Sequence, residues 1–470
     1  MLLVDYPTIV QKYSSFFEHV FSERDYAHFK KAVSGYIVSE NKTVTGLHRL
    51  FVLEGEDSTS FNRFFNNQNF DLEELNARRL SFLQSNPSTR FKSGKKEGVL
   101  SIDNSLLTHY GKHFDGIYVL KDYVNGGYKW SHDYVSLHYN DDLCDYPVYD
   151  KLWDAPDWEG VANFFMDKGF TINKDKWLNR HKEGQKWRNY IRSRYKKGRK
   201  KYDEVKAIYK TKIDIAEDLL DKFCKDYPDH KPPISIDTGF TSAQFCGAIV
   251  QKGFDYVGNL RAEQKIITAK SGEITLAEFL QKLRLENKEG TNTIFQKVGY
   301  HYKGEKQIAY AYFANQKIKG FDKNQRLVIF FHKEDLSDPP HFVISNRLDW
   351  YPSGILRIRR HRWPVETYHQ EAKAEGLGKY QVRNEKAIQT HLALVVVAYS
   401  MLQYARHDKA LLSKIQQKLQ TEIGTTLPFL RRLMKADGFY NVVEYIYHSI
   451  KQGVSFQTVF KPFARNIAYT

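Results

Sequence analysis

The segment EGVLSIDNSLL, residues 97–107, decides the fold, because it has the pattern of a buried strand that ends on a carboxylate. The apolar run stops at Asp103. Two further strand-like stretches follow, DGIYVLKDYV (115–124) and YKWSHDYVSLHY (128–139), joined by the turn-forming triplet NGG at 125–127. The sequence therefore predicts three successive strands, the first of which ends on an acidic side chain.

A second short strand ends in the same way. HKPPISIDTGF (230–240) stops its apolar run at Asp237, and a predicted helix at 241–252 and the strand FDYVGNL (254–260) come next. Helices are also predicted at 157–168 and around 205–225. This alternation predicts an α/β fold with a mixed sheet flanked by helices. If the strands share one sheet, Asp103 and Asp237 emerge at neighbouring strand ends.

A third carboxylate lies in RHRWPVETYHQEAKAEGLGKY, residues 360–380. On one continuous helix, Arg362 and Glu366 would be about 40° apart and Glu366 and Lys373 about 20° apart, so all three share a face. One interpretation is a solvated face with intrahelical ion pairs. The other is a carboxylate held for chemistry beside cations that bind an anion. Glu371 would lie about 140° from Glu366, off the cationic face.

Two residues set the expected limits of this helix. Pro364 should either begin a new helix or kink a continuous one, and Gly376 should end it.

Asp103, Asp237 and Glu366 would repel one another if they met without cations between them. Three such carboxylates suit two Mg²⁺ ions roughly 4 Å apart, with Mn²⁺ as a substitute, as in two-metal phosphoryl-transfer sites. Each aspartate alone is weak evidence, because Asp at a strand end often only forms a turn or caps a helix. Other acidic residues remain competing candidates: Asp141, Asp142 and Asp145.

Composition favours a polyanionic partner. The 470-residue chain has a formal charge of +16 and a pI near 9.3, which makes nucleic acid the first candidate. Its cysteines (Cys144, Cys224 and Cys246) are isolated, which argues against a disulfide framework or structural zinc and agrees with a reducing cytoplasm. We expect no secretory signal and no membrane span, since the apolar stretch at 392–402 is too short and should be a buried core helix.

Much of the charge is concentrated between residues 174 and 212, where 16 Lys and Arg oppose 4 Asp and Glu. Aromatic residues alternate with these cations, a combination that favours salt-sensitive, sequence-independent DNA binding. The alternative is a solvated basic helix whose aromatics dock it to the protein, and both can hold at once. The candidate phosphate contacts are Arg188, Arg192, Arg194, Lys196, Lys197, Arg199, Lys200 and Lys201.

The pattern divides the chain into successive regions. A helical DNA-binding region is expected first, and within it residues 43–65 have the form of a helix-turn-helix. The turn would lie near Gly55, and Ser58 or Thr59 would cap a second helix that carries Asn62 and Arg63. An ordinary helical hairpin is an equally good interpretation. The expected regions are 1–95 (helical, DNA-binding), 96–262 (catalytic, first part), 263–344 (a β-rich insertion), 345–408 (catalytic, second part) and 409–470 (helical, with protein contacts).

Several blocks resemble bacterial insertion-sequence transposases of the DDE class, in the branch with a Tyr-Arg-Glu-Lys signature. These blocks are VLSIDNS, ISIDTGF, VGNLR, NRLDW and RHRWPVETYHQEAKAEGLGKYQVR, and they extend over residues 95–405. The spacing of Arg362, Glu366 and Lys373 matches the signature. The resemblance implies a ribonuclease H-like fold with a β-rich insertion, and Asp103, Asp237 and Glu366 as the metal-binding triad.

The same resemblance implies a function. Such an enzyme performs cut-and-paste transposition on double-stranded DNA, acting on terminal inverted repeats and a target, as a homodimer in the bacterial cytoplasm near the nucleoid. One departure matters: the signature places Tyr at position 359, where this chain has Arg359. Arg359 either substitutes as a cationic phosphate contact or marks a weakened copy, and it leaves open whether a hairpin intermediate forms.

Other functions stay in view. A decayed or domesticated transposase would bind DNA without cleaving it, and a ribonuclease H-like nuclease would cut without joining. A carboxylate-based glycosidase is disfavoured, because it leaves the charge of +16 and the cations around Glu366 without a purpose.

Overall fold

The computed structural model describes residues 2–53, 58–94, 97–269, 272–287, 294–422 and 424–467. The chain forms two compact units. The first comprises Met1–Asp103, Leu137–Tyr149 and Pro228–Thr470, and the second comprises Asn104–Ser136 and Asp150–Tyr227. Three strands continue through both units: β1 (Val99–Thr108), β3 (Tyr128–Asn140) and β4 (Asp145–Trp153).

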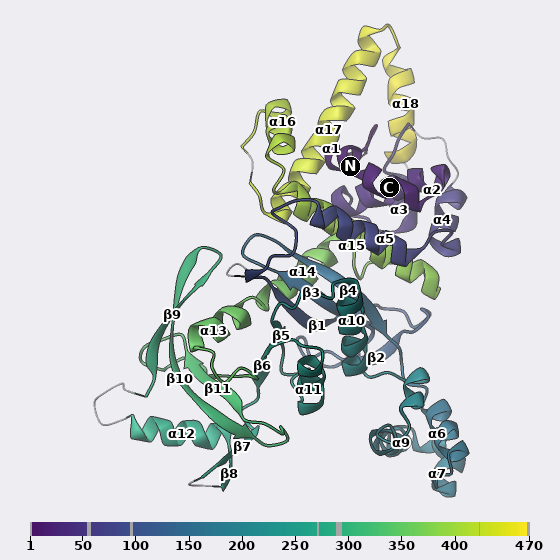
Figure 1. The fold of residues 1–470 in the computed structure, drawn as a ribbon. Helices are drawn as coiled ribbons and strands as arrows, with labels where there is room; N and C mark the ends of the chain where they lie inside the picture. The colour runs from purple at the N-terminus through teal and green to yellow at the C-terminus, as the bar shows by residue number, and fades with distance from the viewer. Residues whose placement is uncertain are drawn as a thin grey trace. The chain divides into compact units, whose positions relative to one another are not determined.

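The first unit is built on a mixed sheet. β5 (Ile234–Ile236) pairs in parallel with β1 on one side and with β6 (Tyr256–Leu260) on the other. β3 lies next to β1, and β4 pairs with β3. The order β4-β3-β1-β5-β6, with β1, β5 and β6 parallel, is a ribonuclease H-like arrangement (Figure 1). The predicted α/β fold class is confirmed.

The β-rich segment continues this sheet. β12 (His341–Ser345) pairs antiparallel with β6, and β11 (Gln325–Phe331) and β10 (Glu305–Ile318) follow in order. The remaining strands pair with β10 or with each other: β9 (Gln296–Tyr302), β7 (Lys265–Thr268) and β8 (Gly272–Thr275). The segment also contains α12 (Leu276–Glu286), a helix that the sequence analysis did not predict, although a Thr275–Glu278 capping box begins it.

Helices α13 (Pro352–Arg360) and α14 (Trp363–Glu375) carry the expected third carboxylate. They are separate helices that break at His361–Arg362, with Pro364 in the first turn of α14, so Pro364 begins a helix instead of kinking one. Gly376, at φ 124°, ends α14 as predicted. The apolar face of α13 packs into a core with the strands: Val99, Val257, Val343, Ile355, Leu356 and Ile358.

Helix α15 (Glu385–Ala405) packs against α2, α4 and α5 and also contacts α1, α14 and α17. Residues 392–402 are almost wholly buried within α15, which confirms a core helix. None of the helices in the described ranges is long and apolar enough to span a membrane. The helices are α1 (Thr8–Tyr13), α2 (Glu23–Val38), α3 (Val44–His48), α4 (Ser58–Asn67), α5 (Leu72–Gln84), α11 (Ala243–Gln251), α16 (Lys409–Leu419), α17 (Leu427–Lys451) and α18 (Phe456–Ile467).

The predicted helix-turn-helix falls on α3 and α4. The turn near Gly55 lies outside the described residues. On α4, Asn62 and Arg63 are exposed, while Phe61, Phe64 and Phe65 are buried. This division leaves Asn62 and Arg63 accessible to a ligand, and DNA contact by them stays a prediction.

The second unit holds the basic segment. Its elements beyond the shared strands are β2 (Tyr118–Lys121), α6 (Trp158–Asp167), α7 (Lys174–Leu178), α8 (Arg180–Glu183), α9 (Gln185–Gly198), the 3₁₀ turn η3 (Asp203–Ala207) and α10 (Lys212–Asp226). Trp187, Ile191 and Tyr195, spaced by four on α9, are buried against Phe165 of α6. The aromatics therefore dock the helix, as the second interpretation of this segment predicts. Its exposed cations remain accessible, and DNA binding by them stays a prediction.

Gly198 permits this packing, because a Cβ at that position would overlap the Phe165 ring. We expect Gly198→Ala to destabilise the α6–α9 contact by about 1–3 kcal/mol, the usual range for overpacking. Faster amide hydrogen exchange in α6 and α9 would report it. Gly247→Ala on α11 is the matched control, because no neighbour lies within 4 Å of the added Cβ. Unchanged protection of α6 and α9 in Gly198→Ala would contradict the packing argument.

Candidate active site

Three carboxylates far apart in sequence converge on one guanidinium, that of Arg362. Its Nη1 donates to Asp103 Oδ2 at 3.2 Å, and its Nη2 donates to Glu366 Oε1 at 2.5 Å. Nη2 also lies 4.0 Å from Asp237 Oδ1. The three predicted metal-ligand candidates therefore gather around a single positive charge.

The sheet register explains this convergence. Ile102 of β1 pairs with Ile236 of β5 in a parallel ladder, so the next residues, Asp103 and Asp237, lie side by side. Asp237 follows the end of β5, whereas β1 continues past Asp103 to Thr108, so the prediction that the first strand ends on Asp103 was wrong. Glu366 reaches the same point from the first turn of α14. Figure 1 shows β1 and β5 side by side in the sheet.

Arg362 is not placed as the sequence analysis expected. It is the N-cap residue of α14 and not an interior helical residue, because the chain breaks between the two helices. Its side chain is only 13% exposed. The Arg362–Glu366 pair exists, yet the same guanidinium also holds Asp103, which a solvated i,i+4 pair would not do. Lys373 lies half-buried on α14, two turns beyond Glu366.

Electrostatics keep Arg362 charged. Burial lowers its pKa, but Asp237, Asp103 and Glu366 outweigh burial and raise the pKa above the usual value. Three carboxylic side chains share one guanidinium, so acidic groups outnumber the cation in this cluster. The site is therefore electrostatically prepared for additional cations.

The chemistry of the donors suits divalent metal ions, since carboxylate oxygens are the ligands that Mg²⁺ prefers. Within the described residues, however, no group of three His, Cys, Asp or Glu side chains is arranged to hold a metal ion. The Arg362 guanidinium contacts all three carboxylates of the triad. Metal binding by this triad would therefore require Arg362 to withdraw.

Arg359 contacts the site through Asn259. Its Nε donates to Asn259 Oδ1 at 3.2 Å, and Asn259 Nδ2 donates to Asp237 Oδ1 at 3.4 Å. Its Nη2 lies 3.1 Å from Nδ1 of His341, whose pKa burial and the Arg359 charge lower to about 4, so the imidazole is neutral and accepts. Burial lowers the pKa of Arg359 itself to about 10. Arg359 is thus held by partners within the chain.

The sequence analysis did not predict a role for Asn259 or His341. For Asn259 the strand order gives the reason to expect one, because β6 pairs in parallel with β5 and Ile236 is opposite Gly258. Aligning the two strands would have placed Asn259 beside Asp237. His341 lies beyond the β-rich segment, and no local pattern ties it to Arg359.

The competing carboxylates have other partners. Asp141 pairs with Lys92 at 2.8 Å, and Asp145 accepts from Tyr399 at 2.6 Å. The His361 imidazole, whose Nε2 lies 3.3 Å from Asp142 Oδ1, lowers the pKa of Asp142 to about 2. These contacts separate the three from the Arg362 cluster.

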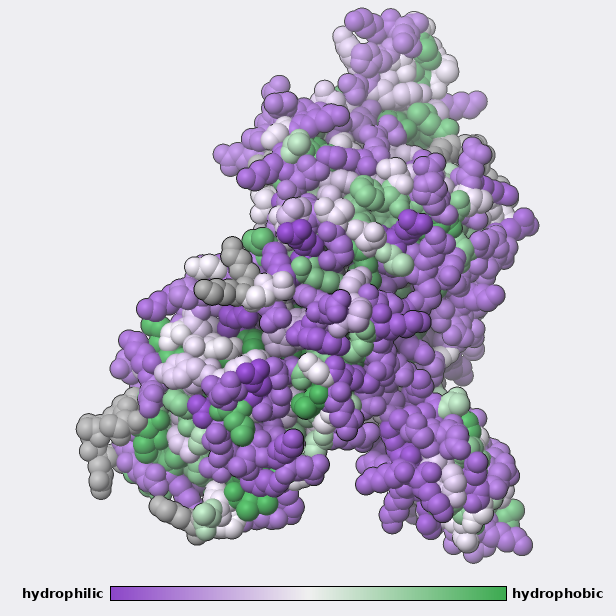
Figure 2. All heavy atoms as spheres, viewed as in Figure 1, coloured by the Kyte–Doolittle hydropathy of each residue, from purple (hydrophilic) through white to green (hydrophobic). Residues whose placement is uncertain are grey.

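The basic segment divides into paired and exposed cations. Arg199, a predicted phosphate contact, instead forms an ion pair with buried Asp214, so its charge is already neutralised. Arg194 is half-buried. The other predicted contacts are exposed: Arg188, Arg192, Lys196, Lys197, Lys200 and Lys201. Hydrophilic side chains dominate the visible face of this part of the molecule (Figure 2).

Residues 209–401 match a family described as "Transposase DDE domain". This segment of the chain is similar to a transposase DDE domain. The chain is thus an enzyme that cleaves and transfers DNA strands, a class that generally uses divalent metal ions. Asp237 and Glu366 lie inside the matched DDE segment, and Asp103 precedes it.

Other comparisons add little to this assignment. A piggyBac transposase in a synaptic complex with hairpin DNA is similar at 12% sequence identity and a TM-score of 0.42, over 94% of this chain and 78% of that one. No curated protein matches the chain.

Arg362 predicts a measurable competition with metal. We expect Arg362→Gln to raise Mn²⁺ affinity at least about ten-fold without DNA, because a unit charge about 4 Å away is worth about 1–4 kcal/mol. Calorimetric titration measures the affinity. Arg360→Gln is the matched control, because it removes the same charge two residues away. The Arg360 side chain lies over the Tyr302 ring. Equal affinities in both variants would refute the competition.

Proposed function

We propose that this chain is an insertion-sequence transposase, which excises and inserts DNA by two-metal phosphodiester cleavage and strand transfer at terminal inverted repeats. The observation that carries the proposal is the convergence of Asp103, Asp237 and Glu366 on the Arg362 guanidinium. Asp103 within β1, Asp237 just after β5 and Glu366 on α14 form a polar centre, and the family match over residues 209–401 supports its chemical class.

Asp103, Asp237 and Glu366 would hold the cofactor, two Mg²⁺ ions for which Mn²⁺ substitutes. When bound, such ions activate a water or 3′-hydroxyl and stabilise the leaving 3′-oxygen. In our proposal Arg362 leaves the carboxylates and binds a DNA phosphate, for which its planar guanidinium is suited. Lys373 contributes a second cation on the same helix. Arg359 positions Asn259, and through it Asp237.

The DNA substrate is the double-stranded transposon end, followed by the target. We propose that the exposed cations of α9 and its C-terminal end hold the phosphate backbone, chiefly Arg188, Arg192, Lys196, Lys197 and Lys200. Their contribution is independent of sequence and falls steeply with salt. Asn62 and Arg63 on α4 are proposed to contact the terminal repeat. The enzyme is proposed to work in the bacterial cytoplasm, at the nucleoid.

Glu366→Gln tests the assigned roles. The substitution removes one negative charge but keeps the size of the side chain, so we expect at least a 100-fold loss of strand cleavage, consistent with removal of a main electrostatic contribution. DNA binding should change less than about three-fold. Cleavage of labelled DNA carrying the element's ends in Mg²⁺ or Mn²⁺ is the assay. Glu371→Gln is the control, because Glu371 pairs with Arg431.

Three outcomes of that assay separate the candidate functions. Full cleavage by Glu366→Gln would refute the assignment of Glu366. Metal-independent end binding by the native chain with no cleavage would favour a decayed transposase that only binds DNA, and Arg359 in place of the signature Tyr is the observation behind that alternative. Nicking without joined products would favour a nuclease.

Pairing of two DNA ends predicts a homodimer in the cleavage-competent complex. The helices of residues 409–470 are the proposed contact region, because α17 and α18 leave large apolar side chains exposed: Phe439, Val443, Tyr447, Ile450, Phe456 and Phe460. We expect Val443→Glu/Tyr447→Glu to halve the mass of the DNA complex in light scattering while leaving the fold intact. A monomeric complex that cleaves both ends would overturn the prediction.

A further inference from the structure

The second unit contains a basic, aromatic pocket of about 550 Å³, inside the 300–1,000 Å³ range usual for small-molecule sites. It lies between the connection that follows α6 and the helix α9 with its C-terminal end. All of its lining residues are described, and they include three cations and no carboxylate: Lys168, Gly169, Phe170, Thr171, Asn173, Tyr190, Arg194, Lys201 and Tyr202. A negatively charged ligand with an aromatic surface would suit this lining.

The walls repeat one pattern, a tyrosine flanked by two cations. Tyr190 has Arg194 at 5.3 Å and Lys176 at 5.1 Å from its ring centroid. Tyr202 has Lys201 at 5.2 Å and Lys168 at 5.5 Å. Each wall therefore offers a ring face and positive charge together.

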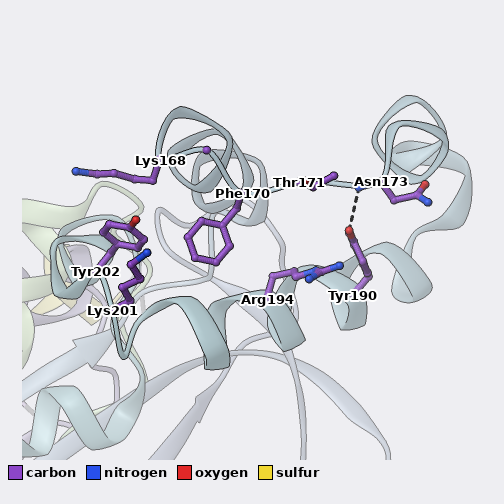
Figure 3. A pocket seen from close by; sticks show the side chains of 9 residues that line it. Lys168, Phe170, Thr171, Asn173, Tyr190, Arg194, Lys201 and Tyr202 are labelled. Carbon is purple, nitrogen blue, oxygen red and sulfur yellow. Dashed lines mark hydrogen bonds between the residues drawn. The ribbon is translucent and has the colours of Figure 1, made fainter.

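Phe170 stands between the two walls, as Figure 3 shows. Its ring packs edge-on against Tyr202 at 5.5 Å, and its amide donates to Phe165 O at 2.8 Å. The turn before it needs Gly169, at φ 80°. On the other side, Tyr190 Oη accepts from the Asn173 amide at 2.9 Å, the dashed line in Figure 3. Both walls are thus held by backbone contacts before any ligand arrives.

The cations of the pocket differ in availability. Lys168 lies 3.7 Å from Glu204 and is partly neutralised. Arg194 and Lys201 form no ion pair with any carboxylate in the described part of the chain. They are free to bind phosphate from opposite sides of Phe170.

We propose that this pocket binds an unpaired nucleotide of a DNA strand, with its phosphates on Arg194 and Lys201 and its base against Phe170 and Tyr202. Base stacking on aromatic rings beside a basic groove is how proteins hold single-stranded nucleic acid. A fully paired duplex keeps its bases stacked inside and cannot fill the pocket. The inference rests on the proposed function for the DNA substrate and adds a preference for a distorted or unpaired position.

The test compares two double variants of the full chain. Arg194→Gln/Lys201→Gln removes both pocket cations, and Arg192→Gln/Lys200→Gln removes two exposed charges that do not line the pocket. Fluorescence anisotropy measures binding to a short duplex and to the same duplex with one unpaired nucleotide. Both variants should lose similar affinity for the paired duplex, because each loses two phosphate-binding charges.

We expect the native chain and the control variant to bind the unpaired-nucleotide DNA about ten-fold more tightly than the duplex, and the pocket variant to lose that preference. Phe170→Leu should lose it too while keeping its affinity for the duplex, which separates stacking from charge. Equal preferences in the pocket and control variants would overturn the proposal. So would equal competition by a deoxynucleoside monophosphate and unpaired-nucleotide DNA, which would assign the pocket to free nucleotides.

Failure of this inference is distinguishable from failure of the proposed function. Native chain that binds and cleaves end DNA without preferring the unpaired nucleotide would overturn the pocket assignment alone. Native chain that binds no DNA at low salt would overturn both. Circular dichroism confirms that each variant is folded.

Discussion

The mutual repulsion of Asp103, Asp237 and Glu366 is the constraint on which the rest of the active site depends. Three carboxylates brought close together are stable only with positive charge between them. Without metal, Arg362 supplies that charge, and its own burial is compensated because all three acids surround it. One guanidinium therefore holds together two strands and a helix that are widely separated in sequence.

In the proposed mechanism, this arrangement would link substrate binding to metal binding. Metal cations that neutralise the triad would remove the attraction that holds Arg362 there, and a nearby phosphate would give the guanidinium a new partner. The break between α13 and α14 places Arg362 at a helix cap, where a change of side-chain direction does not disturb an interior helical turn. The helix break, which in the sequence is only a local feature around Pro364, is thus a structural requirement of the proposed exchange.

How much the sequence predicts depends on whether the signal is local. The apolar runs before Asp103 and Asp237 identify both strands, and the parallel register brings the two carboxylates side by side. The sequence pattern did not show that β1 continues past Asp103 to Thr108. The α12 helix was missed because it interrupts a strand-rich segment, despite its capping box. Arg199 was misassigned because its partner, Asp214, comes from another helix, and charge density alone does not separate a buried pair from an exposed cation.

In the basic segment, the sequence predicts the kind of surface but not which residues form it. Its net charge and alternating aromatics predict a nucleic-acid surface, and the structure divides those residues by helical spacing. Trp187, Ile191 and Tyr195 face the core, Arg188 and Arg192 face solvent, and Tyr190 with Arg194 stands at the margin between them. That margin is where an aromatic ring and a cation are both accessible, which a buried core or a fully solvated face cannot provide. The pocket for a stacked, charged ligand lies where the buried face of α9 meets its solvent-exposed face. Only the folded structure shows where these two faces meet.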